Sequence, residues 1–173
     1  MTDASNVKVA VTGAVYVADI ADLAATGTPG NWTPSANAPT DADTALTSAW
    51  TAVGYISEDG VVEANDTENE EIKAWQNSDI VRKVITKNET SYAFTMIETN
   101  AQALSLFYGK NIIPTATKHV IGGALTGKVG IVIDAVDGTQ AIRRYIPSAE
   151  VTERGEVSIT AADAVGYEVT VTA

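Results

Sequence analysis

The sequence contains no cysteine and a single histidine, and these two absences remove several kinds of chemistry. Without cysteine there is no disulfide, no thiolate nucleophile and no zinc ribbon, although the redox compartment stays open. The one histidine, His119, stands before Val120, and no motif supplies the carboxylate and the nucleophile that a general base needs. One histidine without cysteine also disfavours a zinc or copper site. We therefore predict no enzyme, no cofactor and no metal site.

Basic residues and long apolar segments are scarce as well. The chain has 22 acidic and 11 basic side chains and a formal net charge of -11, so its surface repels nucleic acid phosphates. No segment reaches the roughly 18 consecutive apolar residues that span a membrane. Residues 1–6 lack the basic and apolar regions of a signal peptide. We expect no membrane binding by this chain and synthesis in the cytoplasm.

The residues that are abundant favour β-structure. Apolar residues make up 45% of the 173 residues and charged residues only 19%, a globular composition with enough length for one full core. Leucine is scarce relative to valine and threonine, and β-branched residues favour strands. We predict a mainly β fold, a β-sandwich or half-barrel with one short flanking α-helix, as a single domain over residues 1–173.

The N-terminal third alternates between a strand and a long loop. Lys8 to Val17 is rich in β-branched residues and predicts a strand, with a bulge at Gly13. From about residue 18 to residue 48, proline, glycine and small polar residues disfavour a strand ladder and a long helix. A loop of this length is often functional or disordered, and a solvated excursion without a partner fits the composition equally well.

The segment after the loop predicts two hairpins. A strand near Trp50 to Ser57 runs into Asp59-Gly60, a pair that favours a tight turn, and residues 61–73 continue as an acidic ribbon. Ile80 to Lys87 and Thr90 to Glu98 are predicted to pair around a second turn at residues 88–89.

Two further patterns in this region identify a buried strand and the helix. Tyr92, Phe94 and Met96 alternate on one face, which predicts a central strand. Asn100 can cap a two-turn helix, and Gly109 can end it in a left-handed conformation. The apolar stripe of that helix, which must pack on the sheet, comprises Ala101, Ala103, Leu104, Leu106, Phe107 and Tyr108.

The clearest hairpin lies near the C-terminus. Lys128 to Ala135 and Thr139 to Ile146 alternate strongly and are joined by Asp137-Gly138. Their pairing predicts one face with Ile131, Ile133, Ile142 and Arg144, and an opposite face with Val132, Asp134, Arg143 and Tyr145. Asp134 and Arg143 are then diagonal neighbours.

The remaining C-terminal residues predict two more strands. We expect Pro147 to end the preceding strand. Val151 to Ile159 and Ala164 to Val171 follow as strands, the last with strict alternation of apolar residues.

The acidic residues and the tryptophans are candidate site residues. The acids between Glu58 and Glu71 lack the spacing of a calcium loop, and as catalytic carboxylates they are unspecific. They predict a solvated sheet face or, in an assembly, a negative band along a pore. Trp50 and Trp75 are predicted packing anchors, whereas Trp32 in the long loop is a candidate interface residue.

Trp50, the following GYISEDG at residues 54–60, and the helix after the alternating strand resemble the major tail (tail tube) proteins of long-tailed, siphovirus-type bacteriophages. The order of the predicted elements is similar over most of the chain. The resemblance implies a structural virion protein that forms stacked, hexameric rings. The rings enclose a negatively charged channel through which DNA passes, without specific binding, during ejection.

The resemblance implies roles for particular residues. Candidates for the channel wall are Glu63, Asp66, Glu68 and Glu70. Candidates for contacts between stacked rings lie in the long loop: Trp32, Pro34, Asp41 and Asp43. Arg144 is a candidate for an intersubunit salt link, with a surface arginine as the alternative. Expected partners are other copies of the chain, a tape-measure protein and tail-end proteins, in the tail of the virion.

Two other functions remain compatible with the sequence. The inner-tube subunits of contractile tails and injection systems share the implied fold, and they would need a surrounding sheath. A β-sandwich decoration or adhesion module is the other alternative, and it predicts a soluble monomer or trimer with a ligand site on a loop.

Overall fold

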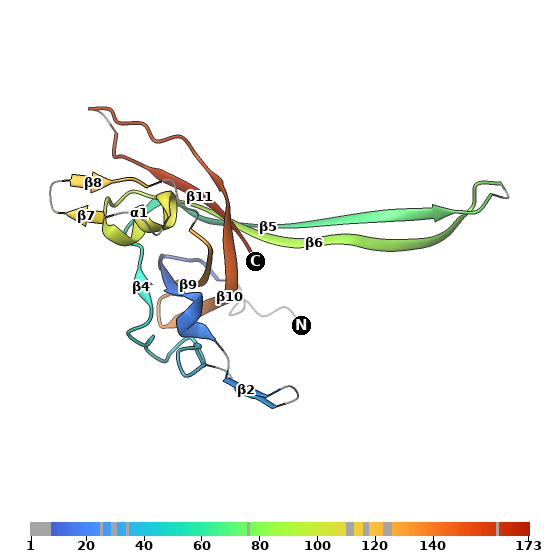
Figure 1. The fold of residues 1–173 in the computed structure, drawn as a ribbon, viewed down its shortest axis with the longest axis horizontal. Coiled ribbons are helices and arrows are strands. Elements are labelled where there is room, and N and C mark those ends of the chain that lie inside the picture. The colour runs from blue at the N-terminus through green and yellow to red at the C-terminus, as the bar shows by residue number, and fades with distance from the viewer. Residues whose placement is uncertain are drawn as a thin grey trace.

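One antiparallel sheet and one short helix form the body of the protein, from which a long two-stranded ribbon projects (Figure 1). The computed structural model describes residues 8–24, 26–28, 31–33, 35–75, 77–109, 113–115, 118–122, 126–161 and 163–173. Its elements are β1 (Thr12–Asp19), the 3-10 helix η2 (Ile20–Leu23), β2 (Thr26–Thr28), β3 (Asn31–Thr33), β4 (Thr51–Ala52), β5 (Ile56–Lys73), β6 (Ile80–Met96), α1 (Ala101–Tyr108), β7 (Ile113–Thr115), β8 (Lys118–Val120), β9 (Lys128–Asp137), β10 (Gln140–Arg154) and β11 (Tyr167–Thr172).

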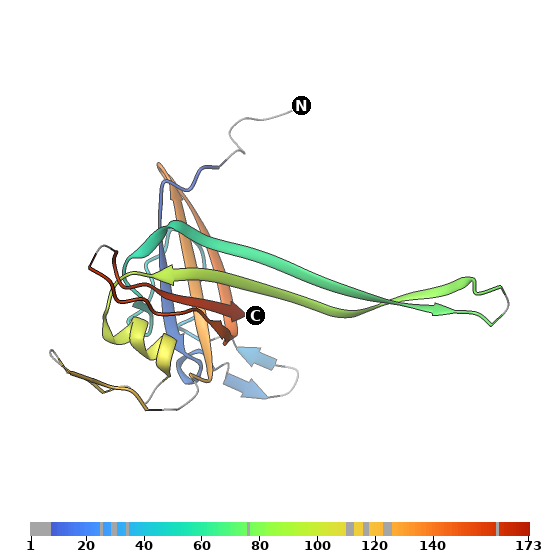
Figure 2. The same cartoon turned by 90° about the horizontal axis from the view of Figure 1, so that it is seen from above.

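The seven strands of the main sheet follow the order β4-β1-β9-β10-β11-β6-β5. β10 is long enough to pair with β9 through its first part and with β11 through its last residues. In Figure 2 the strands β1 and β9 run across the direction of β11, β6 and β5, so the sheet is strongly twisted and curved. The predicted mainly β class with one short α-helix is confirmed. Seven strands form one continuous sheet, and β2–β3 and β7–β8 pair as two separate two-stranded sheets.

The main core fills the concave side of this sheet. Tyr92, Phe94 and Met96 of β6 are buried there, as their alternation predicted. They meet alternating residues of β11, among them Val169 and Val171, which are fully buried. The helix α1 closes this core, and its Phe107 packs edge-on against Tyr167 of β11. Apolar burial at this interface is what holds a helix of only two turns in place.

The caps of α1 agree with the sequence. The Asn100 side chain accepts a hydrogen bond of 2.8 Å from the Ala103 amide and donates one of 2.9 Å to the Val53 carbonyl. Gly109 ends the helix with φ of 102°. Its positive φ is as predicted, although its ψ of 169° lies outside the left-handed helical region.

The opposite face of β1 and β9 carries a second, smaller core. Trp50 is buried there against Val132, and its ring meets Tyr145 edge-on with centroids 5.9 Å apart. The predicted packing role of Trp50 and the predicted face of Val132 and Tyr145 are thus confirmed. Residues 35–50 cover this face, because the Trp50 indole donates a 2.7 Å hydrogen bond to the Asn37 carbonyl. This part of the long loop is therefore packed on its own domain.

Two predicted turns are wrong, and in both places the strand continues. Asp59-Gly60 belongs to a bulge in β5, where the four residues 57–60 lie opposite the single residue Thr95. The positive φ of Gly60, 69°, serves this bulge rather than a hairpin turn. Residues 88–89 lie in the middle of β6, paired with residues 66–67 of β5.

Three smaller predictions, two on strands and one on the long loop, are also wrong. β1 pairs with β9 without a register shift, so Gly13 forms no bulge, and a Cβ there would lie 2.6 Å from the Asp134 carbonyl oxygen. Pro147 does not end β10, because it falls in a bulge between Ile146 and Ala149 where no ladder donor is needed. The loop does contain a strand ladder, the β2–β3 hairpin.

The Asn100 cap offers a test of how the helix is held on the sheet. We expect Asn100→Ala to lower the free energy of unfolding by about 1–2 kcal/mol, because both a helix cap and a bond to Val53 are lost. Urea denaturation followed by circular dichroism measures this change. Asn88→Ala, at an exposed position of β6, is the control and should change stability by less than about 0.5 kcal/mol. Equal effects of the two substitutions would contradict the assigned role.

Candidate functional site

β5 and β6 form a two-stranded ribbon that projects from the body of the protein (Figures 1 and 2). We call its projecting residues, 65–90, the arm. β6 pairs with β11 as far as Ser91, and the Ala173 amide donates a last hydrogen bond to the Thr90 carbonyl. Residues 80–89 of β6 pair with β5 alone. At about 3.3 Å per residue, residues 65–73 of β5 extend roughly 30 Å from the sheet, before the turn. A two-stranded ribbon without other support is marginally stable in water. Such an arm therefore needs contacts outside its own chain.

Alternation along β5 separates its acidic residues into two sets. Asp66, Glu68 and Glu70 share one face, the continuation of the sheet's outer face, which points away from the main core. Glu63 lies directly opposite Tyr92 and thus on the other face. The structure brings together three of the four predicted channel residues and places the fourth apart.

The outer face carries further carboxylates that the sequence analysis did not include. Glu168 of β11 and Glu150 and Glu153 of β10 are exposed, and their strand partners Thr95, Thr172 and Thr170 point away from the core. Together with Asp66, Glu68, Glu70 and Glu89 they form what we call the acidic face. The alternation of Glu168 with buried Tyr167 and Val169 was the signal that could have found it.

Three basic residues lie among these carboxylates, and one of them, Lys128, is the direct cross-strand partner of Glu150. Lys87 binds Asp66 at 2.7 Å and Glu89 at 3.0 Å, and these hydrogen bonds raise the pKa of Lys87. Arg82 lies on the same face, opposite Ile72. The acidic face therefore keeps a net negative charge, with Glu68 and Glu70 outside the Lys87 ion pairs.

The end of the arm is apolar and basic. Trp75, predicted to be a packing anchor, is 98% exposed, so that prediction is wrong. A 2.8 Å bond from the Ala74 amide to the Asp79 carbonyl closes the turn, with positive φ at Asn77 and Ser78. Exposed large apolar side chains gather around it: Ile72, Trp75, Ile80, Val81 and Ile85.

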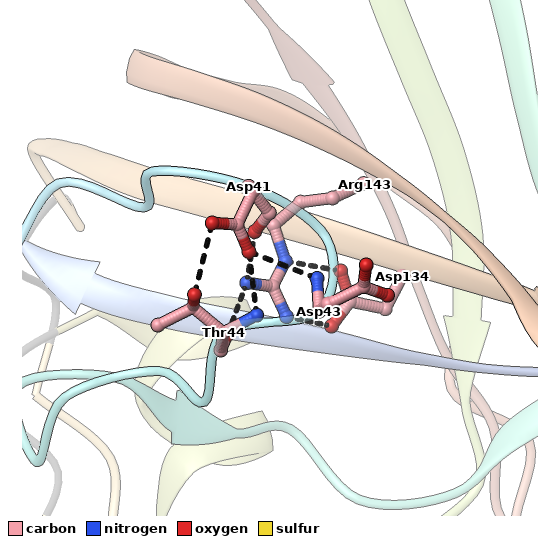
Figure 3. Close-up of polar contacts among 5 residues, drawn as sticks. All are labelled: Asp41, Asp43, Thr44, Asp134 and Arg143. Atoms are coloured by element: carbon pink, nitrogen blue, oxygen red, sulfur yellow. Dashed lines mark hydrogen bonds and ion pairs between the residues drawn. The ribbon is translucent and has the colours of Figure 1, made fainter.

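Arg143 fastens the long loop to the sheet (Figure 3). Its Nε and Nη2 donate to the two carboxylate oxygens of Asp134, each at 2.7 Å, and Asp134 is its direct cross-strand partner rather than a diagonal one. Its Nη1 donates to the carbonyls of Asp41 and Thr44 at 2.7 and 2.8 Å. We call these contacts of Arg143 with Asp134, Asp41 and Thr44 the Arg143 clasp. Only 9% of the Arg143 side chain is exposed, so the clasp is largely shielded from water.

Asp41 organises the same loop segment. Its carboxylate accepts hydrogen bonds from the Thr44 hydroxyl and from the amides of Thr44 and Asp43. The hydrogen bonds from Thr44 lower the pKa of Asp41. Asp41 and Asp43 are exposed at the surface. Of the other two predicted loop contacts, Pro34 and the side chain of Trp32 lie outside the described residues, and Trp32 belongs to β3.

Arg144 and Glu63 form an ion pair at the open end of the curved sheet. The Arg144 Nε lies 3.0 Å from the Glu63 carboxylate, so Arg144 has a partner within its own chain. Its predicted face, shared with Ile133, agrees with the strand register. Burial, together with the charge of Glu63, raises the pKa of the neighbouring Tyr92. The pair lies beside a cavity of about 490 Å³ between β1 and β5.

Two features that the described residues lack bear on other functions. No cluster of three or more histidine, aspartate or glutamate side chains in these residues has the geometry to hold a metal ion. In the same part of the chain, no helix has the length and hydropathy needed to cross a membrane.

A comparison with protein families identifies the family to which the chain belongs. The family model described as phage tail tube protein matches residues 1–173. The chain belongs to the phage tail tube proteins. It has a structural role in the virion tail, where the family assembles from copies of itself into a tube. Among curated proteins, none matches this sequence.

The Arg143 clasp in this tail tube protein can be tested by removing the guanidinium. We expect Arg143→Ala to destabilise the fold by about 2–4 kcal/mol, because it leaves the Asp134 carboxylate shielded and unpaired. It should also speed hydrogen exchange in residues 41–44. The matched control is Lys83→Ala, which breaks the exposed Lys83–Glu71 pair and should cost about 0–1 kcal/mol. Unchanged exchange in the loop would show that the clasp does not hold it.

Proposed function

We propose that this tail tube protein polymerises as stacked, hexameric rings whose channel is negatively charged and carries DNA during ejection. The observation that carries the proposal is the arm, a ribbon about 30 Å long with no partner among the described residues of its own chain. A projecting element that packs on the next copy gives a heterologous interface, and repetition of such an interface closes a ring or continues as a filament. The resemblance to long-tailed phage proteins favours six copies in each ring.

The acidic face supplies the channel wall in this proposal. Carboxylates on one flat sheet surface, with few basic residues among them, repel a polyanion, so DNA slides past without binding. Threonine and serine fill the face between the acids, notably Thr170, Thr172 and Ser91, and these small side chains leave it smooth. Asp66, Glu68 and Glu70 belong to this wall, whereas Glu63 does not share it.

The clasped loop and the arm supply contacts between rings. Arg143 fixes the backbone of residues 41–44, so Asp41 and Asp43 are presented on a rigid loop at the surface. A rigid loop loses little conformational entropy on binding, which favours its use as a contact. Further partners of the tube are a tape-measure protein and tail-end proteins, and the chain is made in the cytoplasm of the host.

A contractile tail is the second candidate function. Its inner tube would use the same ring and the same acidic channel, and its outer surface would also bind a sheath protein. The absence or presence of a sheath around tubes from virions distinguishes the two tails.

Purified protein tests the proposal directly. We expect concentrated protein to form hollow tubes with sixfold rings in negative-stain electron microscopy. Deleting the end of the arm by joining Glu70 to Val84, which are cross-strand partners, through a two-residue Asn-Gly turn should leave a folded monomer that forms none. Wild-type protein that stays monomeric at high concentration contradicts the proposal.

Cysteine labelling tests the channel wall, because the natural chain has no cysteine. We expect Glu68→Cys in assembled tubes to react with a small maleimide but not with a bulky maleimide-polymer conjugate. In disassembled protein it should react with both. Ala101→Cys, exposed on α1 away from the acidic face, is the control for assembly itself. Labelling of Glu68→Cys in tubes by the bulky reagent, or by neither reagent, would place residue 68 outside the channel.

A further inference from the structure

The arm ends in a surface that is unusual for an exposed turn. Residues 72–83, which we call the tip, present Trp75 at 98% exposure together with Ile72, Ile80 and Val81. The tip contains three basic residues, Lys73, Arg82 and Lys83, and one acidic residue, Asp79. Its net charge is +2. Because the whole chain carries a net charge of -11, the residues outside the tip carry -13. A basic, apolar tip on an acidic protein is complementary to the body of another copy.

A cavity on the body of the protein has properties that complement those of the tip. The cavity of about 490 Å³ opens between the start of β1 and the bulge of β5. Its walls include Ile56, Val61 and Ile133, and its rim includes Val11 and Tyr55, which are 75% and 77% exposed. Glu58 adds an exposed carboxylate at the rim. An exposed apolar rim around a concave site is typical of an interaction surface.

Size and geometry are compatible with a tryptophan guest from another molecule. A cavity of roughly 150 Å³ already holds a benzene ring, so about 490 Å³ is ample for an indole. The arm points away from the body in both views, so the tip cannot fold back into the cavity of its own chain as the arm stands (Figures 1 and 2).

We infer that the tip of one copy docks into this cavity of a second copy, with the Trp75 side chain inserted. This inference rests on the proposed tube and assigns the receptor for its arm. The basic residues of the tip then lie near Glu58 and the Glu63–Arg144 pair. Because tip and cavity are different surfaces of the same chain, the contact is heterologous and can repeat around a ring or along the tube.

Cross-linking between engineered cysteines tests the contact. Ser78→Cys at the tip combined with Ala10→Cys at the cavity should give chains linked in series when tubes are treated with a short bismaleimide. Ser78→Cys with Ala101→Cys is the matched control, since residue 101 is an exposed alanine outside the cavity. Linked chains in the control pair alone, or a link confined to one chain, would overturn the inference.

Tryptophan accessibility gives an independent measurement. We expect assembly to shift the Trp75 emission to the blue and to protect it from acrylamide, a change that Trp75→Phe removes from the spectrum. Trp75→Ala should raise the protein concentration needed for tubes at least about tenfold. Its fold should be intact, because the side chain is exposed. Ile159→Ala, at an 82% exposed residue outside tip and cavity, should leave that concentration unchanged.

The outcomes separate this inference from the proposed function. Tubes in which Trp75 stays open to acrylamide would overturn the docking while leaving the tube intact. A wild-type protein that forms no tubes would overturn the tube and the docking together.

Discussion

The main constraint on this protein is that its longest strands extend beyond its core. β5 and β6 pair over most of their length with each other alone, and in the arm, residues 65–90, no third strand and no helix of the described residues packs behind them. Backbone hydrogen bonds hold the ribbon together, but apolar burial, the main driving force of folding, is missing along the arm. The missing burial has to come from other molecules, which is how a small domain becomes a subunit of a tube.

The rest of the molecule anchors this arm. The curved sheet and α1 build one core, and Trp50 with the Arg143 clasp build a second on the opposite face of β1 and β9. A sheet packed on both faces is a rigid base, and rigidity transmits the position of the body to the end of the arm. Alternation along β5 and β6 then gives the arm two surfaces, an outer one with carboxylates and an inner one that continues from the core.

Local patterns in the sequence were informative where a segment interacts with its chain neighbours. The Asn100 cap, the alternation of Tyr92, Phe94 and Met96, and the Asp137-Gly138 turn were all predicted, because capping, pleating and tight turns depend on a few adjacent residues. The same local rules gave false turns at Asp59-Gly60 and at residues 88–89. Both pairs suit a turn, but a strand runs through each because a long partner strand is available across the sheet. Trp75 failed as an anchor for a related reason, since its burial depends on what the tip meets.

The sequence by itself determined the mainly β class, the single helix, the acidic character and the likeness to tail tube proteins, since these follow from composition, short-range periodicity and element order. Only the tertiary structure decided that β5 and β6 form one projecting arm, that Glu63 pairs with Arg144 while Asp66, Glu68 and Glu70 face away, and that the long loop is clasped by Arg143. The physical reason is that strand register and pairing partners join residues far apart in the chain. A shift of one residue in register moves every side chain to the other face of the sheet.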